Sequence, residues 1–248
     1  MKLLQWNVWY QEDIDNILQT IEAVDPDILC LQELTTNFVP QRRRNTAHYL
    51  SEKLGMHCFY KAARETIDAD GSHTFGNAII SHHPIRDTAF HFVRFPSPAA
   101  GEPADPLAEP RVYLEAGLRI GRRRLDVATI HMSYVPEFGQ TAAKRAEADA
   151  LVEILRKKKR RFVIGGDFNS LPESYTVLAV EKYLRDVGPA RDQNTWTTKP
   201  FSYGGFLANT RDWRIDYCFA TPDIQVKSAR IVETPYSDHL PILVDFEL

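Results

Sequence analysis

The order strand, helix, strand occurs twice in this sequence, and this repeat limits the possible folds more than any other feature. In the first copy, residues 2–8 are rich in β-formers, apolar residues recur at helical spacing over 14–24, and residues 27–31 are apolar again. In the second copy, residues 124–130, 143–155 and 161–165 follow the same order. We therefore expect an α/β fold in which residues 1–248 form one domain built from two similar halves.

A polar or ionisable residue stands where each of these four strands ends. Asn7 and Glu33 end the strands of the first copy, and His131 and Asp167 end those of the second. Sheet-based enzymes commonly place their chemistry on strand termini and the loops that follow. We expect these four strand ends to meet at one rim.

The remaining segments favour strands over helices. We expect helices near residues 45–54 and 175–182, and strands at 57–62, 75–81, 113–120, 215–220, 226–233 and 242–246. Residues 96–110 contain five prolines, too many for a regular element, so we expect a surface loop there.

Charge and cysteine content exclude several classes of protein. The chain has 30 Lys and Arg against 33 Asp and Glu, a net charge of -3, and so lacks the positive field that favours non-specific nucleic-acid or membrane binding. Cys30, Cys58 and Cys218 have no CxxC spacing, which is typical of a reducing compartment. The N-terminal residues turn polar too early for a signal peptide, and no apolar run reaches the ~18 residues of a membrane span. We expect a soluble, cytoplasmic protein.

The segment Gly165-Gly166-Asp167-Phe168-Asn169 is the densest group of functional residue types. Two residues apart at a strand end, Asp167 and Asn169 are expected on the same face, where they can hold one water molecule. The alternative is an Asx turn in which the glycines supply positive φ.

A second group contains two carboxylates and a histidine. Asp238 precedes His239 just before the last apolar strand, and Asp216 interrupts another apolar strand. A buried carboxylate without a partner is costly, so we expect Asp216 to have one, with a histidine as the favoured candidate.

A third set consists of oxygen ligands. Glu33 follows an almost continuously apolar strand, although a solvated strand end is the alternative, and Asn7 alone is more simply a satisfied core amide. Taken together, Glu33, Asp238 and the Asn7 amide suit a hard cation such as Mg²⁺ or Mn²⁺. The remaining acids and histidines suit hydrolysis of a phosphate ester.

Seven short motifs in order carry a resemblance to a known family. They are QWN at 5–7, LQE at 31–33, GNAIIS at 76–81, TIH at 129–131, GGDFN at 165–169, RIDY at 214–217 and SDHLP at 237–241. This series resembles the endonuclease/exonuclease/phosphatase superfamily, which includes deoxyribonuclease I, exonuclease III and tyrosyl-DNA phosphodiesterases. The resemblance implies a four-layer αββα sandwich of two pseudo-symmetric halves with mixed, mostly antiparallel sheets.

The same resemblance assigns roles to individual residues. Glu33, with Asn7 and Asp238 nearby, would hold the divalent cation, and Asp167 and Asn169 would position and activate the attacking water.

By this resemblance, His239 paired to Asp216 would contact the phosphoryl oxygens or serve as the base, and the choice of base between Asp167 and His239 stays open. His131 would stabilise the transition state or assist the leaving group.

Three further residues would bind substrate by this resemblance. Arg111 and Asn77 match phosphate contacts. Trp196 matches an aromatic residue near the site that would stack on substrate, with packing in the core or a loop as the alternative.

We therefore expect a Mg²⁺- or Mn²⁺-dependent phosphoesterase, foremost a phosphodiesterase that acts on nucleic-acid ends or related phosphodiesters by in-line water attack. A phosphatase of small-molecule, inositol or lipid phosphates is the alternative within the family, and a non-catalytic binding or scaffold protein is the alternative of another class. The expected partner is a phosphate-ester substrate, which includes DNA or RNA. We expect a monomer without membrane association.

Overall fold

The computed structural model describes residues 1–95 and 109–248, and in these ranges two six-stranded sheets and a two-stranded hairpin form. The first sheet contains, in spatial order, β13 (Gln225–Ile231), β14 (Ile242–Glu247), β1 (Lys2–Asn7), β2 (Ile28–Thr36), β4 (Gly71–Ser81) and β3 (His57–Asp68). The second contains β5 (Ile85–Arg94), β6 (Arg111–Ile120), β7 (Arg123–His131), β8 (Phe162–Asp167), β12 (Asp216–Ala220) and β9 (Arg185–Asp186). The hairpin pairs β10 (Phe201–Tyr203) with β11 (Phe206–Ala208).

The two sheets repeat one arrangement. Each has a parallel pair in its two central positions, β1 with β2 and β7 with β8, and its other neighbouring strands pair antiparallel. A helix connects the members of each parallel pair, as a parallel crossover requires. The expected halves with mixed, mostly antiparallel sheets are confirmed.

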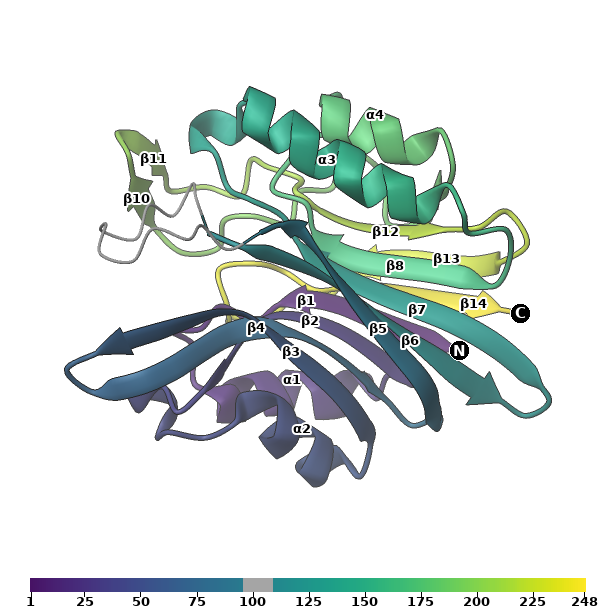
Figure 1. Ribbon diagram of the computed structural model, residues 1–248, viewed down its shortest axis with the longest axis horizontal. Coiled ribbons are helices and arrows are strands. Elements are labelled where there is room, and N and C mark those ends of the chain that lie inside the picture. Colours follow the sequence, from purple (N-terminus) through teal and green to yellow (C-terminus); the bar gives the residue numbers. More distant parts are fainter. Residues whose placement is uncertain (96–108) are drawn as a thin grey trace.

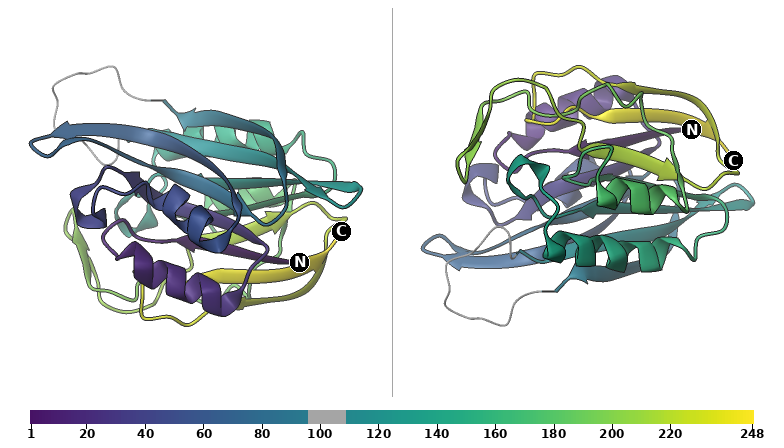
Figure 2. Two further views of the ribbon diagram at one scale, coloured as in Figure 1. Left: turned by 90° about the horizontal axis from the view of Figure 1, so that it is seen from below. Right: turned by 90° about the horizontal axis from the view of Figure 1, so that it is seen from above.

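Helices cover the outer faces of the stacked sheets. Helices α1 (Ile14–Val24) and α2 (Thr46–Leu54) cover the first sheet, and α3 (Ala142–Leu155) and α4 (Tyr175–Glu181) cover the second (Figures 1 and 2). Each begins after a side chain that accepts a hydrogen bond from a first-turn N–H, namely Asp13, Asn45, Thr141 and Ser174. The layers are therefore helix, sheet, sheet, helix, as the resemblance implies.

Strand alternation builds three apolar layers. Along β1, Leu3 packs between the sheets, while Leu4 and Trp6 pack under α1 and α2. The third layer lies between the second sheet and α3 and α4. Because side chains alternate along a strand, Gln5 and Asn7 share the face of Leu3 and point between the sheets. This face becomes polar toward the ends of the central strands.

The predicted helices agree with the observed ones to within one residue at each end. Strands β3 and β4 extend beyond 57–62 and 75–81, because they continue as a hairpin that turns before Gly71. The predicted Pro-rich loop lies largely outside the described residues. Cys30, Cys58 and Cys218 are free thiols. Within 1–95 and 109–248, no helix combines the length and the apolar character needed to cross a membrane.

Candidate functional site

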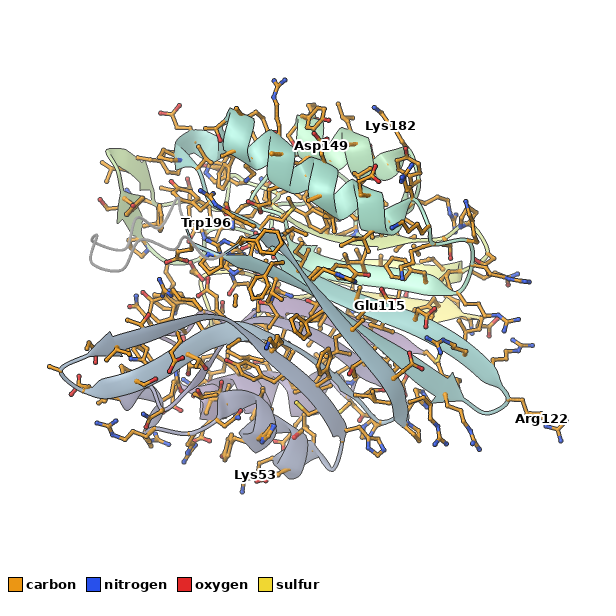
Figure 3. All side chains as sticks on the ribbon, viewed as in Figure 1. Lys53, Glu115, Arg122, Asp149, Lys182 and Trp196 are labelled. Carbon is orange, nitrogen blue, oxygen red and sulfur yellow. The ribbon has the colours of Figure 1, made fainter. Side chains whose placement is uncertain are left out.

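A cavity of about 410 Å³ lies at the end of the sandwich where the central strands end. Figure 3 places Trp196, which lines this cavity, at the opposite end of the molecule from Arg122, in the turn between β6 and β7. Asn7 and Asp216 reach the cavity through direct contacts with residues that line it. The other predicted site residues line the cavity themselves, namely Glu33, Asn77, Arg111, His131, Asp167, Asn169, Trp196, Asp238 and His239.

Asn7, His131 and Asp167, which end β1, β7 and β8, meet at this cavity with Glu33 of β2. Asn7 Nδ2 lies 3.0 Å from Glu33 Oε1 and 3.0 Å from Asp167 Oδ2, and His131 Nε2 lies 3.4 Å from that same Asp167 oxygen. The four residues therefore meet at one rim as expected, but Glu33 does not end its strand, because β2 continues to Thr36. The amide nitrogen of Asn7 faces the carboxylates, since its oxygen accepts the Trp9 N–H at 3.1 Å. In this geometry the Asn7 amide nitrogen hydrogen-bonds to both carboxylates, and the role of Asn7 as an oxygen ligand of a cation stays a prediction.

A β-bulge turns Glu33 into the cavity. The register between β2 and β4 shifts between Leu31 and Leu34, and Glu33 has a φ of 61°. Both leucines pack on the side of α1 and α2, and regular alternation would place Glu33 with Leu31. The extra residue redirects its side chain. The Tyr10 N–H donates to Glu33 Oε2 at 3.2 Å and holds the carboxylate there.

His239 and Asp216 form a buried pair. The distance from His239 Nδ1 to Asp216 Oδ2 is 2.8 Å, and Gln5 Nε2 donates to the other Asp216 oxygen at 3.0 Å. The hydroxyl of Ser237 accepts the His239 N–H at 3.1 Å and donates to the Asn7 carbonyl at 2.7 Å. The histidine partner expected for Asp216 is therefore present, and the Ser237 hydroxyl joins its loop to the end of β1.

Asp167 and Asn169 face the same cavity and also form an Asx-type turn, the two arrangements between which the sequence did not decide. The Asn169 N–H donates to Asp167 Oδ1 at 2.9 Å in an Asx-type turn, and both side chains line the cavity. The positive φ belongs to Asn169, at 47°, and to neither of the two preceding glycines. Gly166 instead permits close packing, because a Cβ there would lie 2.4 Å from the Ile130 carbonyl oxygen.

Burial dominates the electrostatics of the carboxylates. It raises the pKa of Asp167 to about 7, although the positive charge of His239 acts in the opposite direction. Burial and the nearby charge of Asp238 raise the pKa of Glu33, and burial also raises the pKa of Asp238. The buried setting of these acids therefore disfavours their ionised forms.

The two histidines of the cavity carry different charge. Burial opposes protonation of His239, but Asp216, Asp238 and Asp167 together raise its pKa well above the usual value. Burial and the positive charge of Arg111 lower the pKa of His131 well below its usual value. The surrounding carboxylates therefore favour the charged form of His239, and burial favours the neutral form of His131.

The carboxylates of Glu33 and Asp238 fit a hard cation. Asp238 Oδ1 is buried and has no hydrogen-bond partner in the described part of the chain, while its Oδ2 accepts the Trp196 indole N–H at 3.1 Å. Oxygen donors and like-charged carboxylates are the usual environment of Mg²⁺ and Mn²⁺. Ligand atoms of Asp167, Asp216 and His239 also lie within 4.8 Å of one another, but there the histidine and Asp216 already pair with each other.

The three predicted substrate contacts have different surroundings. Arg111 begins β6, and its Nη2 lies 3.4 Å from Glu109 Oε2. Asn77 donates its amide to the Val112 carbonyl at 2.9 Å. Trp196 is only 3% exposed and has its ring among aromatic side chains, so packing, the alternative that the sequence left open, describes most of its contacts.

Two glutamines beneath the cavity escaped prediction. Gln32 Nε2 donates to Gln5 Oε1 at 2.9 Å and to Thr129 Oγ1 at 2.8 Å, which continues the polar chain that ends at Asp216. Gln5 could have been identified from the sequence, because it is a polar residue on the same strand face as Asn7 in an apolar strand.

A buried lysine behind the cavity also escaped prediction. Lys144 Nζ donates to the Ser133 carbonyl at 2.6 Å and to the Asn169 carbonyl. Burial lowers the pKa of Lys144 to about 8. Nothing in the apolar spacing of α3 distinguishes this residue from an exposed lysine.

Comparisons with known proteins agree with this fold. The model of the Endonuclease/Exonuclease/phosphatase family matches residues 4–239. No curated protein is similar enough in sequence to count as a match.

Solved structures of low sequence identity share the fold. An endonuclease/exonuclease/phosphatase from Beutenbergia cavernae DSM 12333 is 20% identical, with a TM-score of 0.75 over 100% of this chain and 71% of that one. A mannosyl-6-phosphatase from Bacteroides thetaiotaomicron VPI-5482 is 18% identical, with a TM-score of 0.68 over 100% of both chains. The humanized TDP2 of D. rerio is 16% identical, with a TM-score of 0.69 over 100% of this chain and 99% of that one. With the family match over nearly its whole length, the chain belongs to the endonuclease/exonuclease/phosphatase family.

Proposed function

We propose that the chain is a divalent-cation-dependent hydrolase of phosphate esters and that its substrates are phosphodiesters, such as those at nucleic-acid ends. One observation carries the proposal. A single cavity combines two carboxylates suited to a cation, an Asp–Asn pair suited to a water molecule, and a histidine with a raised pKa suited to a phosphoryl oxygen.

Glu33 and Asp238 would hold Mg²⁺ or Mn²⁺. When bound, the cation would neutralise charge on the phosphate oxygens. Asp238 Oδ1 is buried and has no hydrogen-bond partner among the described residues, and the two carboxylates repel each other; both observations support this assignment.

The side chains of the cavity divide the remaining tasks. The water oxygen forms a bond to phosphorus as the bond from phosphorus to the ester oxygen breaks. Asp167 takes one proton of the water, and the ester oxygen leaves as an anion that is protonated by solvent. Its pKa of about 7 suits a base at neutral pH. The neighbouring carboxylates raise the pKa of His239 and so favour its charged form, which suits donation from Nε2 to a phosphoryl oxygen and leaves the role of base to Asp167. Asn169 orients the water beside Asp167.

The shape of the cavity supports a diester with a group on each side of the phosphate. Tyr10, Phe38 and Phe75 line it from the first half of the chain, and Tyr134 and Tyr203 line it from the second. Such walls suit planar or apolar groups on either side of the reacting phosphorus. The structural relatives have names as different as mannosyl-6-phosphatase and TDP2, so the class of ester rests on the cavity and not on the shared fold.

Hydrolysis of bis(p-nitrophenyl) phosphate and p-nitrophenyl phosphate, each with Mg²⁺, Mn²⁺ or EDTA, tests the proposal. We expect cation-dependent turnover that favours the diester and falls by about 10²–10⁴-fold in Asp167→Asn. Glu233→Gln is the matched control, because Glu233 pairs with Arg211 in a separate cavity of about 440 Å³. Turnover that resists EDTA, or an Asp167→Asn variant with wild-type rates, would overturn the proposal. Preference for the monoester would overturn its diester part.

A further inference from the structure

Two arginines and a glutamate form an ion cluster on the wall of the catalytic cavity. Glu109 bridges the pair, with Oε1 paired to Arg64 Nη1 and Oε2 lying 3.4 Å from Arg111 Nη2. All three residues line the cavity, and none belongs to the carboxylate and histidine groups described above. One carboxylate thus forms ion pairs with two guanidinium groups.

Local irregularities in the sheet place Arg64 on this wall. The register between β3 and β4 shifts between Ala62 and Arg64, which sets Arg64 opposite Phe75. The guanidinium carbon lies 4.6 Å from the centre of the Phe75 ring. The backbones approach so closely here that a Cβ on Gly76 would lie 2.2 Å from the Lys61 carbonyl oxygen. The arginine is therefore held by its strand and its ring contact as well as by Glu109.

Glu109 leaves hydrogen-bond donors of the two guanidinium groups without partners. The Nε atoms of Arg64 and Arg111 are buried and have no hydrogen-bond partner among residues 1–95 and 109–248. The Arg111 side chain is 10% exposed and that of Arg64 26%. Arginine offers five donors in a planar fork, and phosphate provides more acceptor oxygens and more charge than one carboxylate.

We propose that Arg64 and Arg111 form a second anion subsite, which Glu109 occupies in the free protein and which a second phosphate group of the substrate takes over. This inference rests on the proposed function and narrows its substrate class to esters that carry a further phosphate beside the one that reacts. Glu109 is 21% exposed, so its carboxylate moves into water when phosphate replaces it. Arg111 lines the same cavity as His131, Asp167 and His239, so the subsite adjoins the site proposed for the reacting phosphate.

A matched pair of substrates measures the subsite. Thymidine 5′-(p-nitrophenyl phosphate) is compared with the same compound bearing a 3′-phosphate. We expect the 3′-phosphate to lower KM by about 10-fold or more in the wild type, as one additional charge-assisted contact allows. Arg64→Gln removes this difference, and Glu109→Gln enlarges it. The inference is wrong if the wild type shows no difference, or if Arg64→Gln retains it.

Arg44→Gln is the control for a lost arginine. Arg44 lies 4.3 Å from the centre of the Tyr49 ring and 3.1 Å from Asp15, and so has the same kinds of contact outside the cavity. We expect this variant to retain the wild-type preference for the substrate that carries the 3′-phosphate. A preference lost equally in Arg44→Gln would overturn the assignment, because the effect would not be specific to the subsite.

Binding without turnover separates this inference from the proposed function. Calorimetry with thymidine 3′,5′-bisphosphate and thymidine 5′-monophosphate, in the absence of divalent cations, is expected to show tighter binding of the bisphosphate that Arg64→Gln abolishes. If this preference is present but no ester is hydrolysed, the subsite stands and the proposed function fails. If diesters are hydrolysed but the bisphosphate has no advantage, the function stands and the subsite is refuted.

Discussion

Replacement of Asp216 by Asn isolates the contribution of the buried pair. Asp216 is 1% exposed, accepts the Gln5 amide on Oδ1 at 3.0 Å and contacts His239 Nδ1 through Oδ2 at 2.8 Å. The new amide can present its oxygen to only one of these donors. The oxygen of Gln5 is already held by Gln32 at 2.9 Å, so the polar chain cannot reverse without losing another hydrogen bond.

The size of the effect follows from the charge on His239. A hydrogen bond to a charged group contributes about 1.5–3 kcal/mol, which corresponds to about 10–100-fold in kcat/KM if it acts fully in the transition state. The raised pKa of His239 means that its protonated form is lost as pH rises through that pKa. Asp216 is one of the three carboxylates that raise the pKa of His239, so its replacement lowers that pKa, and the protonated form is lost at lower pH. The deficit of Asp216→Asn therefore grows as pH increases.

The assay is the pH dependence of kcat/KM for bis(p-nitrophenyl) phosphate in both proteins at saturating Mn²⁺. Asp186→Asn is the control, because Asp186 is another largely buried carboxylate of the same sheet, 2.8 Å from Arg214 and outside the cavity. We expect it to lose stability without a change in the profile. Coincident profiles for the wild type and Asp216→Asn would refute the proposed role of His239 as a charged donor.

Three further predictions follow from buried groups. Burial and repulsion from Asp238 raise the pKa of Glu33, so ionised Glu33 destabilises the cation-free fold above the normal carboxylate pKa. Glu33→Gln should therefore raise the Tm without cations and should lose the increase in Tm that Mn²⁺ gives the wild type. A Tm equal to that of the wild type in both conditions would contradict this. Lys144→Met leaves two buried carbonyls without their donor, and because each costs about 1–3 kcal/mol, urea unfolding should show a clear loss of stability; an unchanged midpoint would count against it. Gly166→Ala brings a Cβ to 2.4 Å from the Ile130 carbonyl oxygen and should lower the Tm, whereas a Tm at or above the wild-type value would show that β7 and β8 separate without cost.

Local patterns in the sequence predicted the elements and many of their ends. Helical spacing of apolar residues is a short-range feature, so the bounds of α1 to α4 were predicted to within a residue. Strand endings likewise placed Asn7, His131 and Asp167 at one rim, because parallel strands in a repeated unit end on the same side. The resemblance to a family added roles that no local pattern contains.

Features that depend on the partner strand were not predictable. Glu33 was expected at the rim as the end of a strand, but it reaches the cavity through a bulge of β2 against β4, and Arg64 reaches the wall through a bulge of β3 against β4. Such shifts arise from pairing between distant segments, and alternation along one strand gives the wrong face. The direction of the Asn7 amide and the burial of Lys144 depend on contacts from both halves of the chain.

The position of the cation is the most direct test of the proposed active site. A crystal of the chain grown with Mn²⁺ and a non-hydrolysable phosphonate diester gives this position from anomalous scattering. We expect one peak within roughly 2.0–2.6 Å of carboxylate oxygens of both Glu33 and Asp238, with a phosphonate oxygen beside His239 Nε2. A peak held instead by Asp167, Asp216 and His239, or a phosphonate bound outside this cavity, would contradict the proposed site.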